Sequence, residues 1–164
     1  MAHIHINIGS NQNRRKNIFQ ALDALRLNFF DVVCSDIFES NAIGFEGADF
    51  YNMGVNATTD LSVVDVLSVL HTIENNQGRD RSQPKFSSRE IDLDLVLYDE
   101  VIDKTNNLPR DDILQYNFVL APLAQLNPES MHPLEKRTYQ QLFATTTPLK
   151  SYNIQILEYG SDKS

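Results

Sequence analysis

The stretch Ile91-Asp92-Leu93-Asp94-Leu95-Val96-Leu97 is the clearest strand in this sequence. Its alternation of apolar and polar residues is typical of a strand with one buried face. We therefore expect Asp92 and Asp94 on the face opposite the core. Two neighbouring carboxylates repel unless a cation or a shared proton intervenes, and Mg²⁺ commonly takes one or two carboxylates together with substrate phosphates. The alternative is a solvated aspartate pair, although aspartate is a poor strand former. The core face is expected to hold Ile91, Leu93, Leu95 and Leu97.

The loop before this strand gathers positive charge. Arg79, Arg81, Lys85 and Arg89 fall within eleven residues and make up four of the 14 lysines and arginines of the chain. Arginine holds phosphate oxygens by forked hydrogen bonds, and a metal ion can bridge phosphates to carboxylates. Surface salt bridging is the common alternative. Cations beside an aspartate pair favour a site for a metal–triphosphate ligand.

Length and charge limit the possible partners. The chain has 164 residues, and 41% of them are hydrophobic. This predicts one globular domain over 1–164 that needs no disulfide or metal ion to fold. The formal net charge of −8 disfavours nucleic acid and anionic membranes as partners. A nucleotide needs only a local cluster of cations, so it is not excluded. We expect small-molecule substrates and a monomer.

The lack of a visible targeting signal and the single cysteine predict a cytoplasmic protein. The N-terminus has no basic region followed by an apolar stretch, so no signal peptide is expected. No apolar run approaches the ~18 residues that a membrane span requires. The single cysteine, Cys34, is expected to be a buried structural thiol.

Hydrophobic periodicity predicts an α+β fold. The order β-α-β-β-α-β is typical of the ferredoxin-like arrangement, an antiparallel sheet with helices on one face. We expect C-terminal additions beyond it, Asp60 as the cap of the second helix, and His3, His5 and His132 on the surface. The expected strands are 3–8, 29–40, 50–58 and 91–98, the expected helices are 13–27 and 60–77, and the additions are helices at 117–125 and 137–144 and a strand at 152–158.

A longer motif surrounds the aspartate pair. The stretch Lys85-Phe86-Ser87-Ser88-Arg89-Glu90-Ile91-Asp92-Leu93-Asp94-Leu95-Val96 closely resembles the signature of the 6-hydroxymethyl-7,8-dihydropterin pyrophosphokinase family, apart from Ser87. That family moves a diphosphate from ATP to a pterin alcohol in folate biosynthesis and has the same ferredoxin-like fold. Further stretches that resemble it are Ile8-Gly9-Ser10-Asn11, Ile73-Glu74, Gly78-Arg79-Asp80-Arg81 and Phe118-Val119-Leu120-Ala121-Pro122-Leu123.

The resemblance implies a role for each matching residue. Asp92 and Asp94 are implied to hold two Mg²⁺ ions that bridge the ATP phosphates, and Arg79 and Arg89 to neutralise charge on the transferring group. A pterin is a flat heteroaromatic ring, so its site needs stacking faces and a hydrogen-bonding edge. The implied ATP contacts are Glu74, His71, Arg81, Lys85 and Arg110. The implied pterin contacts are Ser40, Ile43, Phe50, Asn52 and Phe118.

Two departures from the family leave other hypotheses open. Arg110 and Tyr116 stand where the family has a histidine and an arginine, so one side of the phosphate site loses a charge. A second hypothesis is therefore a catalytically weak relative that binds nucleotide or pterin. A third is a ferredoxin-like regulatory or RNA-binding module, whose strand aromatics stack on bases. The net charge and the aspartate pair argue against the third hypothesis.

Overall fold

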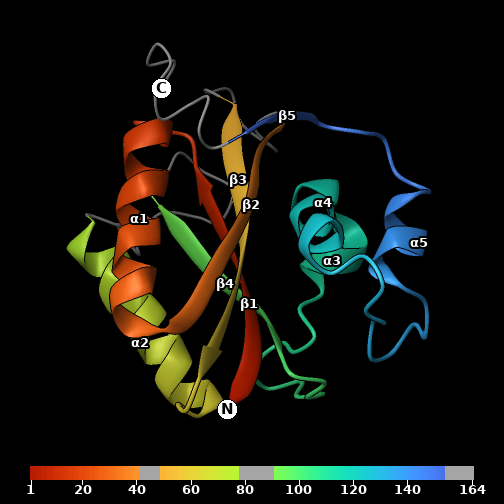
Figure 1. Cartoon of the computed structure of the whole chain (residues 1–164), viewed down its shortest axis with the longest axis horizontal. Coiled ribbons are helices and arrows are strands. Elements are labelled where there is room, and N and C mark those ends of the chain that lie inside the picture. The colour runs from red at the N-terminus through yellow and green to blue at the C-terminus, as the bar shows by residue number, and fades with distance from the viewer. Residues whose placement is uncertain (41–48, 78–90, 154–164) are drawn as a thin grey trace.

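A five-stranded antiparallel sheet forms the centre of the protein. The computed structural model describes residues 1–40, 49–77 and 91–153. The strand order is β4-β1-β3-β2-β5. The first four strands follow the ferredoxin-like order, which confirms the predicted fold (Figure 1). The strands are β1 (Ala2–Ser10), β2 (Phe30–Ser40), β3 (Phe50–Thr59), β4 (Asp92–Tyr98) and β5 (Lys150–Tyr152).

Helices cover both faces of this sheet. Figure 1 shows α1 and α2 on one face, and α3, α4 and α5 on the other. We call these the α1/α2 face and the α4 face. The larger hydrophobic core lies under α1 and α2, and a smaller one joins α4 and α5 to the end of β4. The helices are α1 (Arg14–Asn28), α2 (Val63–Asn76), α3 (Asp112–Gln115), α4 (Asn117–Leu126) and α5 (Tyr139–Phe143).

Several element ends differ from the sequence prediction. Ser62, not Asp60, caps α2, because its backbone is extended and its hydroxyl accepts a hydrogen bond from the Asp65 amide at 3.3 Å. A capping box at Thr138 starts α5 two residues later than expected. The last strand pairs with β2 over Lys150–Tyr152, and the expected continuation beyond 153 lies outside the described residues.

A register shift ends the alternation in β4. His5 of β1 pairs with Leu97, and the next residue, Ile6, pairs with Leu95, so Val96 is an extra residue in β4. Val96 and Leu97 consequently pack with the smaller core near α4. The prediction that Leu97 lies on the main core face was therefore wrong, since strict alternation cannot anticipate a bulge.

Close packing brings α4 onto the sheet. A Cβ atom at Gly54 of β3 would lie 2.8 Å from Cε1 of His5 and 2.8 Å from Cβ of Pro122, so only glycine fits there. Near the C-terminal end of α4, Gln125 makes hydrogen bonds of 2.8 and 2.9 Å to Asp36 of β2. These contacts fix the helix that covers this face of the sheet.

Two histidines predicted on the surface are buried. His5 and His132 are each 2% exposed, whereas His3 is exposed as expected. The ring of His5 lies under α4, and Nδ1 of His132 accepts hydrogen bonds from two backbone amides, those of Leu134 and Glu135. The alternation of β1 shows which face His5 occupies, but not that a later helix covers it.

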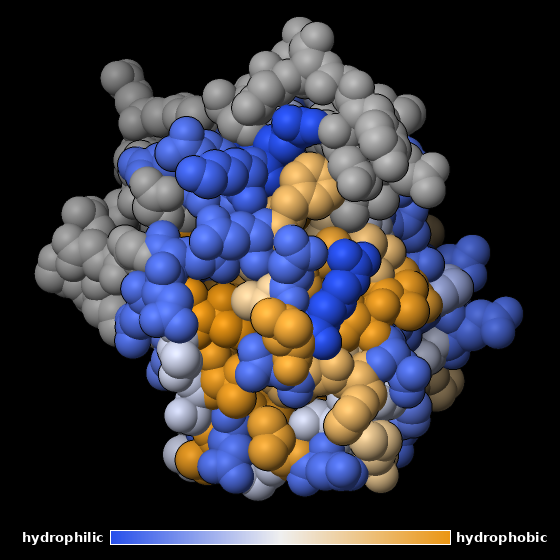
Figure 2. All heavy atoms as spheres, turned by 60° about the vertical axis from the view of Figure 1, so that its left-hand side comes forward, coloured by the Kyte–Doolittle hydropathy of each residue, from blue (hydrophilic) through white to orange (hydrophobic). Residues whose placement is uncertain are grey.

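The outer surface of the helix layer is mixed. Figure 2 brings the α1 and α2 side forward and shows orange hydrophobic groups among blue hydrophilic ones. Leu27 and Val64 are exposed there, which is ordinary for single apolar residues. Cys34 is half-buried against the main core, less than predicted, and burial raises the pKa of its thiol. Within the described ranges, no helix has the length and apolarity to cross a bilayer.

We predict that His5 makes stability depend on pH. Burial lowers the pKa of His5 from 6.5 to about 4, although its hydrogen bond to Asn56 opposes this shift. The unfolded chain therefore binds this proton first as the pH falls, so the free energy of unfolding decreases from about pH 6.5 towards pH 4. Between pH 7 and pH 5 this decrease should be ~2 kcal/mol larger in the natural protein than in His5→Gln.

Urea denaturation at both pH values measures this difference. His3→Gln is the matched control, because His3 is exposed on the same strand and the variant should keep the full pH dependence. An equal decrease in His5→Gln and the natural protein would contradict the prediction.

Candidate active site

Strand β1 aligns polar groups from three strands on the α4 face. Its Gly9 pairs with Asp92 of β4 on one side and with Asn52 of β3 on the other. Two residues earlier, Asn7 pairs with Asp94 and with Gly54. Directly paired residues share a face of the sheet, so both aspartates lie on the face that α4 covers. Both are half-buried, in agreement with the predicted side of the strand.

Asn7 is a neighbour of the aspartates that the sequence analysis did not select. It is 4% exposed, and its Nδ2 donates to Oδ1 of Asn52 over 3.4 Å. Among the described residues, its own Oδ1 has no hydrogen-bond partner. The signal was present in the sequence, because Asn7 alternates with Ile6 and Ile8 and must face the same side as Gly9. An oxygen atom without a partner beside Asp94 suits a cation or its water shell.

Glu74 fixes the strand that carries the aspartates. Its carboxylate is 2% exposed, and Oε2 accepts a 2.7 Å hydrogen bond from the backbone amide of Leu93, the residue between Asp92 and Asp94. The described structure thus gives Glu74 a positioning role that links α2 to β4. Its implied contact with ATP stays a prediction.

Arg110 brings a cation to Asp94. Its Nη2 lies 3.3 Å from Oδ1 of Asp94, and its Nε donates to Oδ2 of Asp112 at 3.0 Å. Burial would lower the pKa of Arg110, but Asp94 and Asp112 outweigh it and the pKa is raised, so the guanidinium stays charged. Asp112 was missed by the sequence analysis, although its position two residues after Arg110 could have suggested the pair.

The residues implied to contact a pterin also come together in part. Nδ2 of Asn52 donates to Oγ of Ser40 at 3.1 Å, and Ser40 pairs with Phe50. A Cβ at Gly9 would lie 3.1 Å from Oδ1 of Asn52 and 4.0 Å from the Phe50 ring. Glycine at this position therefore leaves room beside both groups.

Aromatic rings stand at the start of α4. Phe118, half-buried, stacks on Tyr116 with the ring centroids 5.0 Å apart and the planes 22° apart. His71 is exposed on α2. The remaining predicted site residues lie outside the described residues: Ile43, Arg79, Arg81, Lys85 and Arg89.

Comparison with known families decides what this arrangement belongs to. A family model described as 7,8-dihydro-6-hydroxymethylpterin-pyrophosphokinase matches residues 5–128, which include both aspartates. This chain belongs to that pyrophosphokinase family. The predicted family and an ATP-dependent pyrophosphokinase activity are thereby confirmed.

Individual relatives of this pyrophosphokinase agree with the family. This chain is 31% identical over 157 residues to the 2-amino-4-hydroxy-6-hydroxymethyldihydropteridine pyrophosphokinase of Aquifex aeolicus. The alignment covers 93% of this chain and 96% of that protein. The protein of the same name from Bacillus subtilis is 33% identical over 128 residues, which covers 74% of this chain and 76% of the relative.

A solved structure supports the fold of the pyrophosphokinase. The Plasmodium falciparum HPPK-DHPS wild-type structure with SDX-DHP superimposes with a TM-score of 0.67 at 15% identity. The match covers 88% of this chain and 43% of the Plasmodium chain, so it bears on the fold alone.

We predict that removing the Glu74 carboxylate loosens β4. Glu74→Ala leaves the Leu93 amide without its buried acceptor, which should lower the free energy of unfolding by ~2 kcal/mol. The Leu93 amide should also exchange with deuterium faster, as followed by NMR. Glu74→Gln is the control, because its amide carbonyl can still accept the hydrogen bond. Unchanged protection of Leu93 in Glu74→Ala would show that this bond does not hold the strand.

Proposed function

We propose that Asp92 and Asp94 form the centre at which this pyrophosphokinase transfers diphosphate from ATP to 6-hydroxymethyl-7,8-dihydropterin. The observation that carries the proposal is the pairing of β1 with both β3 and β4. This pairing sets the two aspartates of β4 on the same face as Asn52 of β3, and only β1 lies between those two strands. A phosphate centre and a site for a flat ring can therefore lie side by side.

Two Mg²⁺ ions belong to this proposal, with Asp92 and Asp94 as their protein ligands. The donor set fits, because it consists of half-buried carboxylates and Oδ1 of Asn7, which has no partner among the described residues. All of these are oxygens that a hard cation prefers. Among the described residues, no group of three or more histidines, cysteines or acidic residues could hold a metal. That is consistent with ions that take further ligands from ATP. When bound, they would neutralise and orient the phosphates.

Asn52 is proposed to form hydrogen bonds with the polar edge of the pterin. Its amide is held from both ends, since Oδ1 accepts from Asn7 and Nδ2 donates to Ser40. An amide held in this way presents a donor and an acceptor in a fixed order, which suits the polar edge of a pterin. Phe50 and Phe118 would supply the stacking faces.

The proposed reaction is an in-line displacement at phosphorus. The oxygen of the pterin hydroxymethyl group bonds to the β-phosphorus of ATP, the bond from that phosphorus to the α,β-bridging oxygen breaks, and AMP leaves. The hydroxyl proton is released. The described residues include no strong base beside Asn52, so positioning and charge neutralisation account for most of the acceleration. Arg79 and Arg89 are proposed to neutralise the transferring group.

Arg110 and Tyr116 adapt the site differently from the family pattern. The ion pair with Arg110 orients the Asp94 carboxylate and keeps one positive charge next to the proposed phosphate position. Tyr116 brings no charge, but it stacks on Phe118 and enlarges the aromatic surface. The hypothesis of a catalytically weak relative rests on Arg110 and Tyr116 together. Membership of the family favours the enzyme over a regulatory or RNA-binding module.

The proposal also includes a monomer in the cytoplasm. The chain has one cysteine and therefore no intramolecular disulfide, which is typical of proteins from reducing compartments. Asp92 and Asp94 both come from a single strand, so one chain supplies the carboxylate pair.

We predict that Asp94→Asn removes diphosphate transfer and leaves the fold intact. Replacing one carboxylate at a centre of this kind should lower kcat by at least ~100-fold, since the loss falls on charge stabilisation during the transfer. Pterin binding in the absence of ATP should be retained, because Asn52 and Ser40 are unchanged. The measurement is AMP formation from ATP and 6-hydroxymethyl-7,8-dihydropterin, with circular dichroism as the check on folding.

Asp99→Asn is the matched control for this substitution. Asp99 follows the same strand, is exposed, and lies at the end of β4 away from Asp92. That variant should turn over like the natural protein. Near-natural kcat in Asp94→Asn would remove Asp94 from the proposed centre.

A further inference from the structure

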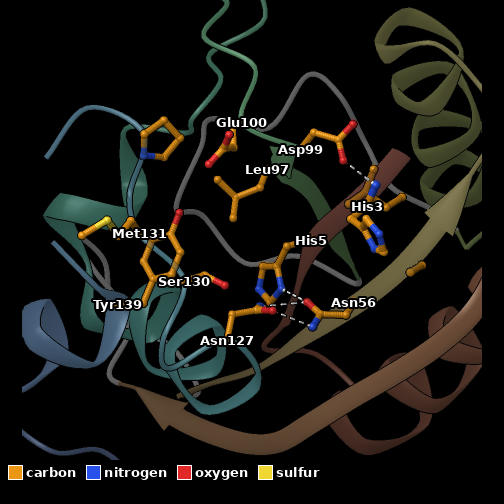
Figure 3. Close-up of a pocket in the computed structure, with 13 residues that line it drawn as sticks. His3, His5, Asn56, Leu97, Asp99, Glu100, Asn127, Ser130, Met131 and Tyr139 are labelled. Carbon is orange, nitrogen blue, oxygen red and sulfur yellow. Dashed lines mark hydrogen bonds between the residues drawn. The ribbon is translucent and has the colours of Figure 1, made fainter. Parts of the chain in front are cut away.

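A cavity opens at the end of this sheet face away from the proposed transfer centre. It has a volume of about 400 Å³ and lies between the ends of β1, β3 and β4 and the segment that follows α4. Figure 3 shows His5, Asn56 and Asn127 close together on one side of the cavity, with Tyr139 on another side. Its volume is within the range of ~300–1,000 Å³ that small-molecule sites occupy.

The cavity and the proposed transfer centre lie at opposite ends of β1. Gly9 marks the aspartate end of β1, whereas His3 and His5 line the cavity near its start. Part of the wall comes from Ser130, Met131, Pro133 and Tyr139, which lie beyond the residues 5–128 that the family model matches. The cavity therefore depends on a part of the chain outside the matched region.

The charge of the lining favours a cation. Asp99 and Glu100 both line the cavity, and no lysine or arginine is among its lining residues in the described structure. One oxygen of Asp99 accepts a hydrogen bond from the His3 backbone amide at 2.7 Å, which fixes its carboxylate at the rim. The pKa of His5, lowered by burial to about 4, keeps that ring neutral at pH 7. An anion such as ATP would be repelled here.

The hydroxyl of Tyr139 provides a second, independent indication of a ligand. Tyr139 is 1% exposed, yet its hydroxyl makes no hydrogen bond to any described residue. Figure 3 shows the hydroxyl end of the ring directed towards Glu100 and the cavity. Burial, reinforced by Glu100, raises the pKa of Tyr139, so the hydroxyl stays protonated and neutral. A hydroxyl on a side chain as buried as Tyr139 usually has a hydrogen-bond partner, which a bound N–H donor would supply.

The opposite wall is rigid and polar. The amides of Asn56 and Asn127 form two reciprocal hydrogen bonds, of 2.9 and 3.0 Å, that join β3 to the end of α4. Nδ1 of His5 lies 2.8 Å from Oδ1 of Asn56. This network holds the shape of the cavity, while Leu97 and Met131 supply apolar surface.

We propose that this cavity binds a small organic cation, with an amidinium or ammonium group at Asp99 and Glu100 and a compact apolar body against Leu97 and Met131. The cation would donate to the two carboxylates and to the oxygen of the Tyr139 hydroxyl. The ligand is opposite in charge to the phosphates of the proposed transfer centre, so the two sites select different molecules.

Three probes of nearly equal shape test the charge preference: benzamidine, benzamide and benzoate. Each is titrated into the ¹⁵N- and methyl-labelled full chain, and NMR shifts are followed at Met131 and Leu97. Benzamidine should give saturable shifts with a Kd of the order of 1 mM, as expected for a fragment of this size. Benzoate should give none, benzamide should bind at least tenfold more weakly, and saturating ATP with Mg²⁺ should not displace benzamidine.

Two variants localise the binding. Glu100→Gln should weaken benzamidine at least fivefold and leave diphosphate transfer unchanged. Glu135→Gln is the matched control, because Glu135 is an exposed carboxylate on the segment between α4 and α5 and does not line the cavity. The proposal is overturned by the absence of saturable shifts at about 20 mM benzamidine, some 20-fold above the expected Kd. Equal binding of benzoate, or an equal loss in both variants, would also overturn it.

Discussion

The simultaneous pairing of β1 with β3 and β4 is the constraint on which the proposed site depends. Asn7 and Gly9 lie on the middle strand of three, and each aligns one aspartate of β4 with one residue of β3. A slip of one residue in either pairing would turn the affected side chains to the opposite face. The main core opposes such a slip, because Ile6 and Ile8 are fully buried on the other face of β1.

Close approach of α4 completes this face of the sheet. Gly54 leaves space for both His5 and Pro122, so the helix lies directly on the strands. At its start α4 carries Phe118, and at its end the neighbouring Asn127 ties it to β3. One helix therefore stands between two different environments, an aspartate pair at one end of the sheet and an acidic cavity at the other.

The sequence was sufficient to predict the strands and the face on which their side chains lie. It was not sufficient to predict which later elements pack on those faces. The alternation around Asp92 and Asp94 correctly indicated their shared face, because a strand's period depends only on local geometry. It failed at Leu97, where a bulge breaks the period, and at His5, where burial comes from a helix more than a hundred residues later. The positioning role of Glu74 and the pair between Arg110 and Asp94 depend on tertiary contacts of the same kind.

The most direct test of the central claim is pterin-dependent formation of AMP by the natural protein. ATP and Mg²⁺ are supplied with and without 6-hydroxymethyl-7,8-dihydropterin, and AMP and the pterin diphosphate are quantified together. The proposed centre predicts that the two products form in equal amounts, only when the pterin and Mg²⁺ are both present. AMP formation at the background level, together with tight binding of the pterin, would contradict the proposed transfer centre. That result would favour a protein that binds the pterin but has lost activity because Tyr116 brings no charge.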